Sequence, residues 1–175
     1  MEKMLSRVKA VLAATPETWQ RLTRGLLAEL LTVSPAPGEW SALECLQHIV
    51  DTETMFKTRL ECLLEGRDFP AFPPGRLSRE PDRNRPASEP ADEFTQLRRL
   101  NLKALGTVGV KDFSRTARHQ QLGPVTLGQM MHQWPAHDLN HTVQAERALM
   151  QPFIAGCGPW DRFFTDHRVK PARPA

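Results

Sequence analysis

The sequence predicts an all-α fold: one domain, residues 1–175, built as a four-helix bundle with a long connection between the second and third helices. Three observations lead to this prediction. Apolar residues recur at helical spacing in four stretches, segments rich in proline and glycine separate these stretches, and two stretches open with a capping box. A chain of 175 residues with 40% hydrophobic content can bury one substantial core without disulfides.

The first helical stretch is predicted from Glu2 to Leu31. A break is expected near Thr15 and Pro16, because threonine can cap a new helix and proline fits the first helical position. Prolines and a glycine after residue 34 should end this stretch.

The second helix has the clearest start signal, because Ser41 and Glu44 form a capping box in which each side chain satisfies a backbone donor of the other. The helix should run to Glu65, with Gly66 as its C-terminal stop. His48 projects to the edge of the apolar stripe of this helix, a position from which a side chain can face a cleft.

Residues 67–90 contain six prolines and few periodic apolar residues, so a long surface crossover is expected there. The third helix should begin near Ser88 and end at the glycines Gly106 and Gly109. An extended stretch then leads past His119 to the fourth helix.

The fourth helix is predicted to begin with a capping box formed by Thr126 and Gln129 and to close at Gln151-Pro152. Its apolar face also carries His137 and His141, one helical turn apart. Pro135 is expected to kink the helix next to them. Residues 166–175 are predicted to form a flexible tail.

Composition excludes several classes of protein. The net charge of +3 is mild, and acidic residues are interspersed among the basic ones, so no nucleic-acid partner is expected. The first nine residues lack the apolar run of a secretory signal, and no segment is long and apolar enough to span a membrane. Cys45 and Cys62 lie on one predicted helix about 25 Å apart, too far for a disulfide. A cytoplasmic location is expected.

The histidines on the second and fourth helices carry the main functional hypothesis. A lone His-x-x-x-His pair is more often structural or exposed than ligating, but an apolar face places His137 and His141 inside the bundle. His48 stands on a helix that should pack beside them, in the kind of position where bundles build metal sites. Three imidazoles without an obligatory fourth protein ligand leave coordination positions for water or substrate.

Several segments resemble the DinB/YfiT-like superfamily: WSALECLQH (40–48), GPVTL (123–127) and HDLNHTVQ (137–144), together with residues 115–119 and 158–160. The resemblance covers most of the chain. It implies a four-helix bundle with a long connection between the second and third helices, usually dimeric. It also implies a divalent metal held by three histidines, which here are His48, His137 and His141.

The reaction that this resemblance implies is less specific, because the superfamily includes hydrolases and S-transferases that use low-molecular-weight thiols. We therefore expect a metal-dependent hydrolase or thiol transferase that acts on a small electrophilic molecule. The alternative is a non-catalytic bundle that binds metal for stability or sensing, or that keeps the histidines as a hydrogen-bonded relic. Zinc or nickel is the first choice of metal, with iron or manganese next, since imidazole suits several of these ions.

Other residues are secondary candidates. Asp138 and Gln144 flank the histidines and could fix the tautomers of these rings through hydrogen bonds. Glu53 lies on an apolar stripe, so it should pair with an arginine such as Arg147 or Arg98. A role of Glu53 as a catalytic general base is the second hypothesis. His119 could overhang the site, although an exposed loop position is the simpler reading. His132 and His167 are expected to be exposed. Trp134 is expected either in the core or as a wall of the site.

Overall fold

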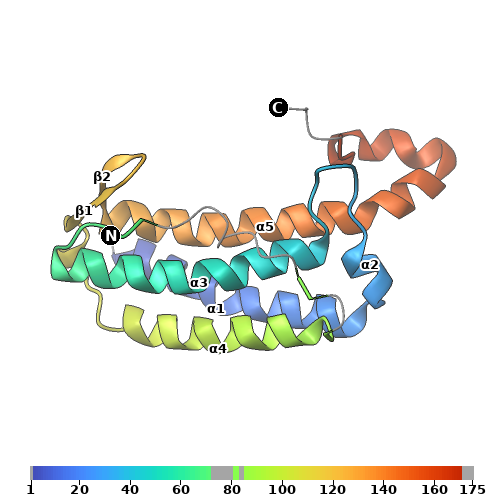
Figure 1. Ribbon diagram of the computed structural model, residues 1–175. Helices are drawn as coiled ribbons and strands as arrows, with labels where there is room; N and C mark the ends of the chain where they lie inside the picture. The colour runs from blue at the N-terminus through green and yellow to red at the C-terminus, as the bar shows by residue number, and fades with distance from the viewer. Residues whose placement is uncertain (1, 72–80, 83–84, 171–175) are drawn as a thin grey trace.

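Four long helices lie side by side in the computed structural model, which describes residues 2–71, 81–82 and 85–170 (Figure 1). The predicted four-helix bundle is therefore confirmed. These helices are α1 (Glu2–Gly25), α3 (Ala42–Glu65), α4 (Ser88–Leu105) and α5 (Leu127–Gly156). The shorter elements are helix α2 (Ala28–Thr32), the 3-10 helices η2 (Val110–Asp112) and η3 (Gly158–His167), and strands β1 (Thr116–His119) and β2 (Gly123–Thr126).

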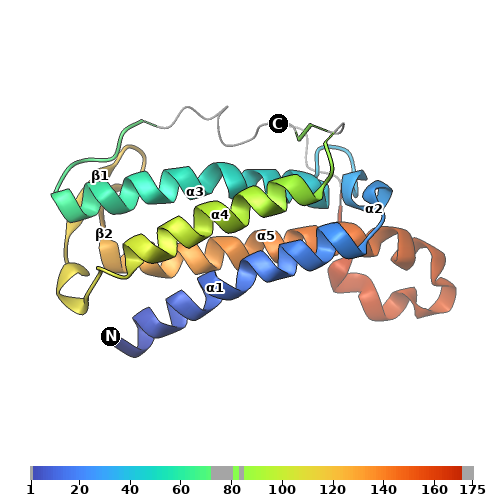
Figure 2. The same cartoon turned by 90° about the horizontal axis from the view of Figure 1, so that it is seen from below.

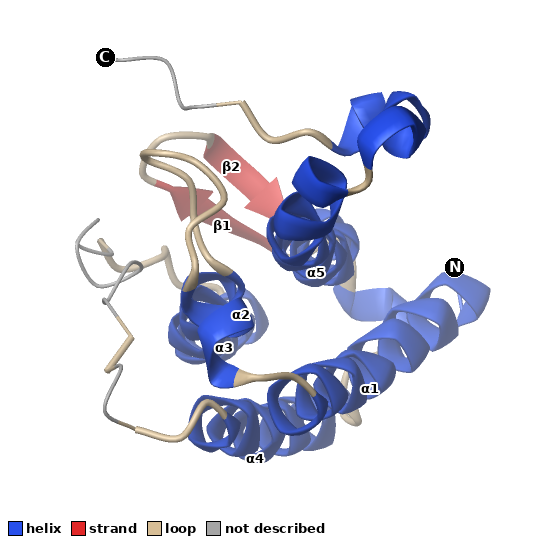
Figure 3. Ribbon diagram, turned by 90° about the vertical axis from the view of Figure 1, so that its right-hand side faces the viewer, coloured by secondary structure: helices blue, strands red, loops and turns tan. Residues whose placement is uncertain are grey.

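Each long helix packs against two neighbours. Helix α1 contacts α4 and α5, and α3 contacts the same two helices from the other side, so α1 and α3 stand at opposite corners of the bundle. The end-on view of Figure 3 and the view of Figure 2 show this arrangement, with the β hairpin and η3 at opposite ends of the bundle in Figure 2. The buried apolar side chains form two clusters along the bundle axis.

Both predicted capping boxes are present. The backbone N–H of Ser41 donates to Glu44 at 2.7 Å, and the Ser41 hydroxyl accepts from the Glu44 backbone at 3.3 Å. Gly66 ends α3 with a φ of +71°, a left-handed conformation that glycine adopts without strain. These local signals explain why the bounds of α3 follow the sequence so closely.

A predicted helix break and a predicted helix end, both placed at prolines, were wrong. Helix α1 continues through Pro16 to Gly25, and α5 continues through Pro152 to Gly156. A proline inside a helix removes one backbone hydrogen bond, but burial of neighbouring side chains compensates for that loss. Pro16 is itself buried against the bundle, and Ile154, beyond Pro152, is 6% exposed.

The extended stretch before α5 is an antiparallel hairpin in which Thr116 pairs with Thr126 and His119 with Gly123. Phe69, on the segment that leaves α3, donates its backbone N–H to the Arg118 carbonyl at 3.1 Å. Part of the predicted crossover, residues 72–80 and 83–84, lies outside the described residues. None of the helices in the described part of the chain has the length and hydropathy needed to cross a membrane.

Candidate metal centre

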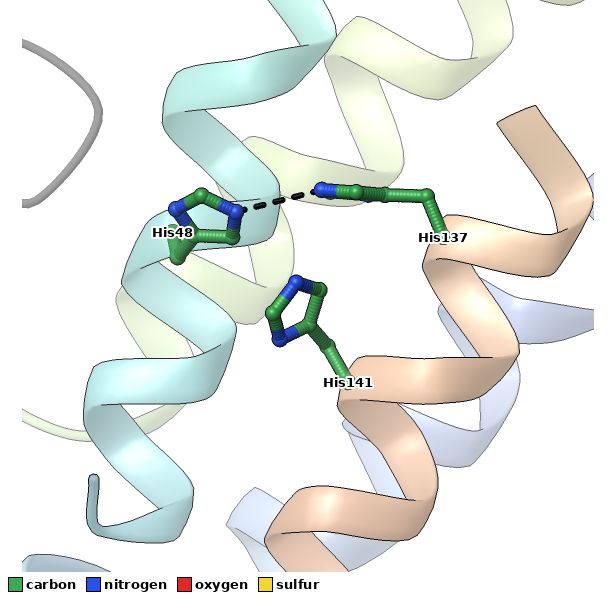
Figure 4. A group of neighbouring side chains, drawn as sticks. All are labelled: His48, His137 and His141. Atoms are coloured by element: carbon green, nitrogen blue, oxygen red, sulfur yellow. Dashed lines mark hydrogen bonds between the residues drawn. The ribbon is translucent and has the colours of Figure 1, made fainter. Parts of the chain in front are cut away.

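Three histidine rings from two helices point toward one another in the space between α3 and α5 (Figure 4). One nitrogen from each of His48, His137 and His141 lies within 4.8 Å of the other two. The Nε2 atoms of His48 and His137 are 3.1 Å apart. Metal–nitrogen bonds of about 2.0–2.1 Å would place two ligand nitrogens about 2.9–3.4 Å apart, so this spacing fits a shared metal ion. It also fits a direct hydrogen bond between the two rings.

Gln144 fixes the orientation of His141. The side-chain oxygen of Gln144 lies 2.9 Å from His141 Nδ1, and an amide oxygen can only accept, so Nδ1 carries the proton. The lone pair of His141 is then on Nε2. The predicted tautomer-fixing role is therefore supported for Gln144, one turn beyond the ligand histidine.

His137 is poorly explained as a structural residue. Its Nδ1 is shielded from solvent and has no hydrogen-bond partner among the described residues, while its Nε2 faces His48. A polar atom left unpaired in the interior costs about 1–3 kcal/mol. Hydrogen bonding to the described residues therefore accounts for at most one nitrogen of this imidazole, the Nε2 that faces His48.

The electrostatic environment keeps two of the rings neutral at pH 7. Burial, with smaller contributions from His141 and His48, lowers the pKa of His137 to about 3. Burial and the proximity of His48 lower the pKa of His141 to about 4, against a raising effect of the bond to Gln144. Only a neutral imidazole binds metal, so these two rings are in the ligating form. Protons should therefore compete with a metal ion for these two rings only well below pH 6.5, which is the pKa of an unperturbed histidine.

Aromatic side chains close two sides of the histidine cluster. The Trp40 ring stacks on His141 with centroids 5.8 Å apart and lies 4.9 Å from His48. Phe56 meets His137 edge-on at 5.6 Å. Trp134 stacks on the Phe56 ring at 4.6 Å and is fully buried, so it supports the site from the core and does not line it.

Glu53 belongs to a buried charged network that sequence reasoning found only in part. Of the two predicted partners, Arg98 is the observed one: its Nε and Nη2 donate to the two Glu53 oxygens at 3.0 and 2.5 Å. The Arg98 Nη1 donates to Asp138 at 2.6 Å, and Thr15 donates to the same Asp138 oxygen at 2.8 Å. Two further donors reach Glu53: Asn101 at 2.7 Å and the Trp134 indole at 3.1 Å.

This network changes the roles expected for two carboxylates. Asp138 points toward α1 and α4, where it meets Thr15 and Arg98, so the predicted hydrogen bond to a ligand histidine is not observed. Glu53 accepts hydrogen bonds at both oxygens, which favours the structural reading over the general-base reading. Sequence reasoning offered Arg98 as a partner of Glu53 but missed its bonds to Asp138 and Thr15, which follow from its place on the buried face of α4.

The remaining histidines lie away from the cluster. His119 is on β1, where its Nε2 is 3.0 Å from an Arg59 nitrogen, and burial together with Arg59 lowers its pKa. It is not among the three clustered ligands in the described part of the chain. His132 and His167 are exposed, as predicted.

Comparison with known proteins agrees with the fold. A family model described as DinB superfamily matches residues 12–145. The chain belongs to the DinB superfamily. YfiT from Bacillus subtilis, described as a probable metal-dependent hydrolase with an unusual four-helix bundle topology, superposes with a TM-score of 0.76 at 16% sequence identity. The match covers 87% of this chain and 89% of YfiT. The comparison with curated proteins returned no match.

The donor set itself fits a divalent ion. Three imidazole nitrogens converge, and the described residues contribute no carboxylate or thiolate to the cluster. Such a set leaves coordination positions open, which is typical of catalytic and not of structural sites. Sequence reasoning predicted these three residues, and the structure brings all of them together.

Proposed function

We propose that this DinB-superfamily protein is a divalent-metal-dependent enzyme that acts on a small electrophilic molecule, by hydrolysis or by transfer to a low-molecular-weight thiol. The observation that carries the proposal is the convergence of His48, His137 and His141 at metal-ligand spacing. Zinc or nickel is the first choice of metal, followed by iron or manganese, because imidazole alone does not select among them. We also propose that the enzyme works as a homodimer, without nucleic-acid or membrane partners.

A divalent ion in such a site would act as a Lewis acid and would lower the pKa of a water or thiol that occupies an open position. The surrounding residues of this chain have separate tasks. Gln144 holds the His141 ring in the ligating tautomer, and Trp40 and Phe56 keep water away from two sides of the cluster. Low local polarity strengthens the interaction of the site with a charged ligand.

The two carboxylates considered as bases are engaged elsewhere in the described part of the chain. Glu53 and Asp138 are both held by Arg98, and Gln144 is not basic. We therefore propose that the nucleophile is activated at the metal and not by a separate side chain. Hydrolysis is the first reading, supported by the description of YfiT, and thiol transfer is the second.

The alternative function is a bundle that binds metal for stability or sensing without catalysis, or that keeps the histidines as a hydrogen-bonded pair. The Nε2–Nε2 distance of 3.1 Å supports this alternative, since it fits a hydrogen bond as well as a shared metal.

Metal analysis of tag-free protein separates these functions. The wild type should bind one divalent ion per chain after repletion with zinc, nickel, iron or manganese, while His48→Ala and His137→Ala should lose it. His132→Ala is the matched control, because His132 is exposed on the same helix as His137. A wild type that stays metal-free under repletion would refute the proposal.

A second experiment asks which reaction occurs. Metal-loaded protein is mixed with a model electrophile, with and without added thiol, and the His141→Ala variant is run in parallel. Consumption without thiol, lost in the variant, supports hydrolysis. Consumption only with thiol supports transfer, and no consumption in either case supports the non-catalytic alternative.

A further inference from the structure

A second feature of functional interest adjoins the histidine cluster: a cavity of about 650 Å³ between the loop before α3, the second half of α5 and the segment after η3. That volume lies within the range typical of small-molecule sites. The cavity shares two residues with the histidine centre, Trp40, which stacks on His141, and Gln144, which bonds to the same ring. The cavity and the histidine cluster therefore meet at these two side chains.

Arg147 is the main cationic group on the α5 wall of this cavity. It stands six residues after His141, about 9 Å along the helix axis at ~1.5 Å per residue. Its Nη2 donates to the Asp166 carbonyl at 2.9 Å, which holds the guanidinium in place. Its Nε–H is shielded from solvent, so the donors that a ligand can reach are the N–H groups of Nη1 and Nη2 that the Asp166 bond leaves unused. The two Nη groups of a fixed guanidinium are suited to a carboxylate, which can accept two parallel hydrogen bonds.

The C-terminal segment completes the wall. The chain turns back after α5, so that η3 runs over the end of that helix (Figure 1). Two hydrogen bonds to Gln151 hold the end of η3 and the residues after it: Gln151 donates to the His167 carbonyl, and Val169 N–H donates to the Gln151 side chain. This places Lys170 at the cavity, while Arg168, also on the wall, is paired with Asp161.

The cavity is not a general anion trap. Glu39 and Asp166 also line it, so a polyanion would meet repulsion as well as attraction. A monocarboxylate can pair with Arg147 and meets less of this repulsion than a polyanion does. The remaining volume, next to Trp40, suits the organic part of the same molecule.

We propose that this cavity binds the carboxylate of a small organic monoacid through Arg147, with Lys170 as a second cation, and that the reacting group of that acid reaches the histidine centre. The role of the acid as substrate rests on the function proposed above, whereas its binding to the cavity does not.

Binding of hippurate, a monocarboxylate with an amide and an aromatic ring, tests the proposal by calorimetry. Its neutral amide, an analogue with an ammonium in place of the carboxylate, and citrate as a polyanion serve as comparison ligands. Hippurate should bind to the wild type at least about tenfold more tightly than any of these three, as expected when one charge-assisted hydrogen-bonded contact is lost.

Arg147→Gln should weaken hippurate binding about tenfold or more, and Lys170→Gln should weaken it by a smaller factor. Arg162→Gln is the matched control, because Arg162 is an η3 arginine that does not line the cavity. Lys170→Gln leaves the Arg147–Asp166 contact untouched, so its effect separates lost recognition from a loosened C-terminal segment. Equal affinity for hippurate and its amide, an unchanged affinity in both cavity variants, or no saturable binding would overturn the proposal.

The same titration on His137→Ala protein separates this proposal from the function proposed above. Hippurate binding should persist without the metal ligand, because Arg147 and not the histidine pair makes the contact. Metal content of Arg147→Gln, measured in parallel, should equal that of the wild type. A wild type that binds hippurate selectively but no metal would refute the proposed enzyme function and support the carboxylate site. A wild type that binds metal but shows no selectivity for hippurate would refute the carboxylate site and leave the enzyme function supported.

Discussion

Replacing Arg98 by methionine tests the idea that one buried arginine holds the four long helices together. Its side chain is 1% exposed and donates five hydrogen bonds, to Glu53, Asp138, Thr15 and the Leu12 carbonyl. Methionine is similar in length but has no donors. The variant would leave two carboxylates buried without a cation, and breaking a buried ion pair in this way costs about 3–5 kcal/mol. That is a large share of the 5–15 kcal/mol that stabilises a typical domain.

The assay is urea and thermal unfolding of metal-free protein, followed by circular dichroism. Arg98→Met should lower the midpoint temperature by roughly 6–20 °C, at about 2–4 °C per kcal/mol for a chain of this size. Arg99→Met is the control, because Arg99 is the exposed neighbour on the same helix and its loss should shift the midpoint little. Adding Glu53→Gln and Asp138→Asn to Arg98→Met should restore part of the stability, since it removes the unpaired charges. An Arg98→Met protein whose free energy of unfolding lies within about 1 kcal/mol of the wild-type value would refute the reasoning.

Three further predictions concern local contacts. Gln144→Ala should weaken metal binding about 10–100-fold in a chelator competition, because the His141 tautomer is no longer fixed, and an unchanged affinity would contradict this role. Ser41→Ala should destabilise the protein by about 1 kcal/mol in urea unfolding, since it removes one half of the capping box, whereas no change would mean that the cap is redundant. The Gly109 N–H and Arg115 lower the pKa of Asp112 below its ordinary 3.8, so its carboxylate stabilises the fold above that pH, and this stability is lost as the pH falls through the folded-state pKa. Unfolding measured from pH 7 to 2 should therefore show a deficit of Asp112→Asn that shrinks in acid, and a constant deficit would exclude this origin.

Local sequence signals predicted the features that depend on neighbouring residues. The capping box at Ser41 and the glycine at 66 define α3, and the spacing of His137 and His141 places both rings on one helical face. Pro152 misled the prediction of the end of α5, because the burial that carries a helix past a proline comes from tertiary contacts.

Asp138 shows why sequence proximity was a poor guide to contact. Successive residues on a helix point about 100° apart, so Asp138 faces α1 and α4 while His137 faces α3. The choice between Arg98 and Arg147 as the partner of Glu53 likewise depended on which helix lies opposite, and Arg147 instead bonds to the C-terminal segment.

The charged network and the histidine centre occupy two sides of α5 and constrain it together. Glu53, on the same helix as His48, accepts from the Trp134 indole and from Arg98, which also holds Asp138. A slip of α5 by one helical turn would move it about 5.4 Å and would break these bonds. The network therefore fixes the register that brings His137 opposite His48. Changes at Arg98 that leave the protein folded should weaken metal binding through this register, although Arg98 itself contributes no metal ligand.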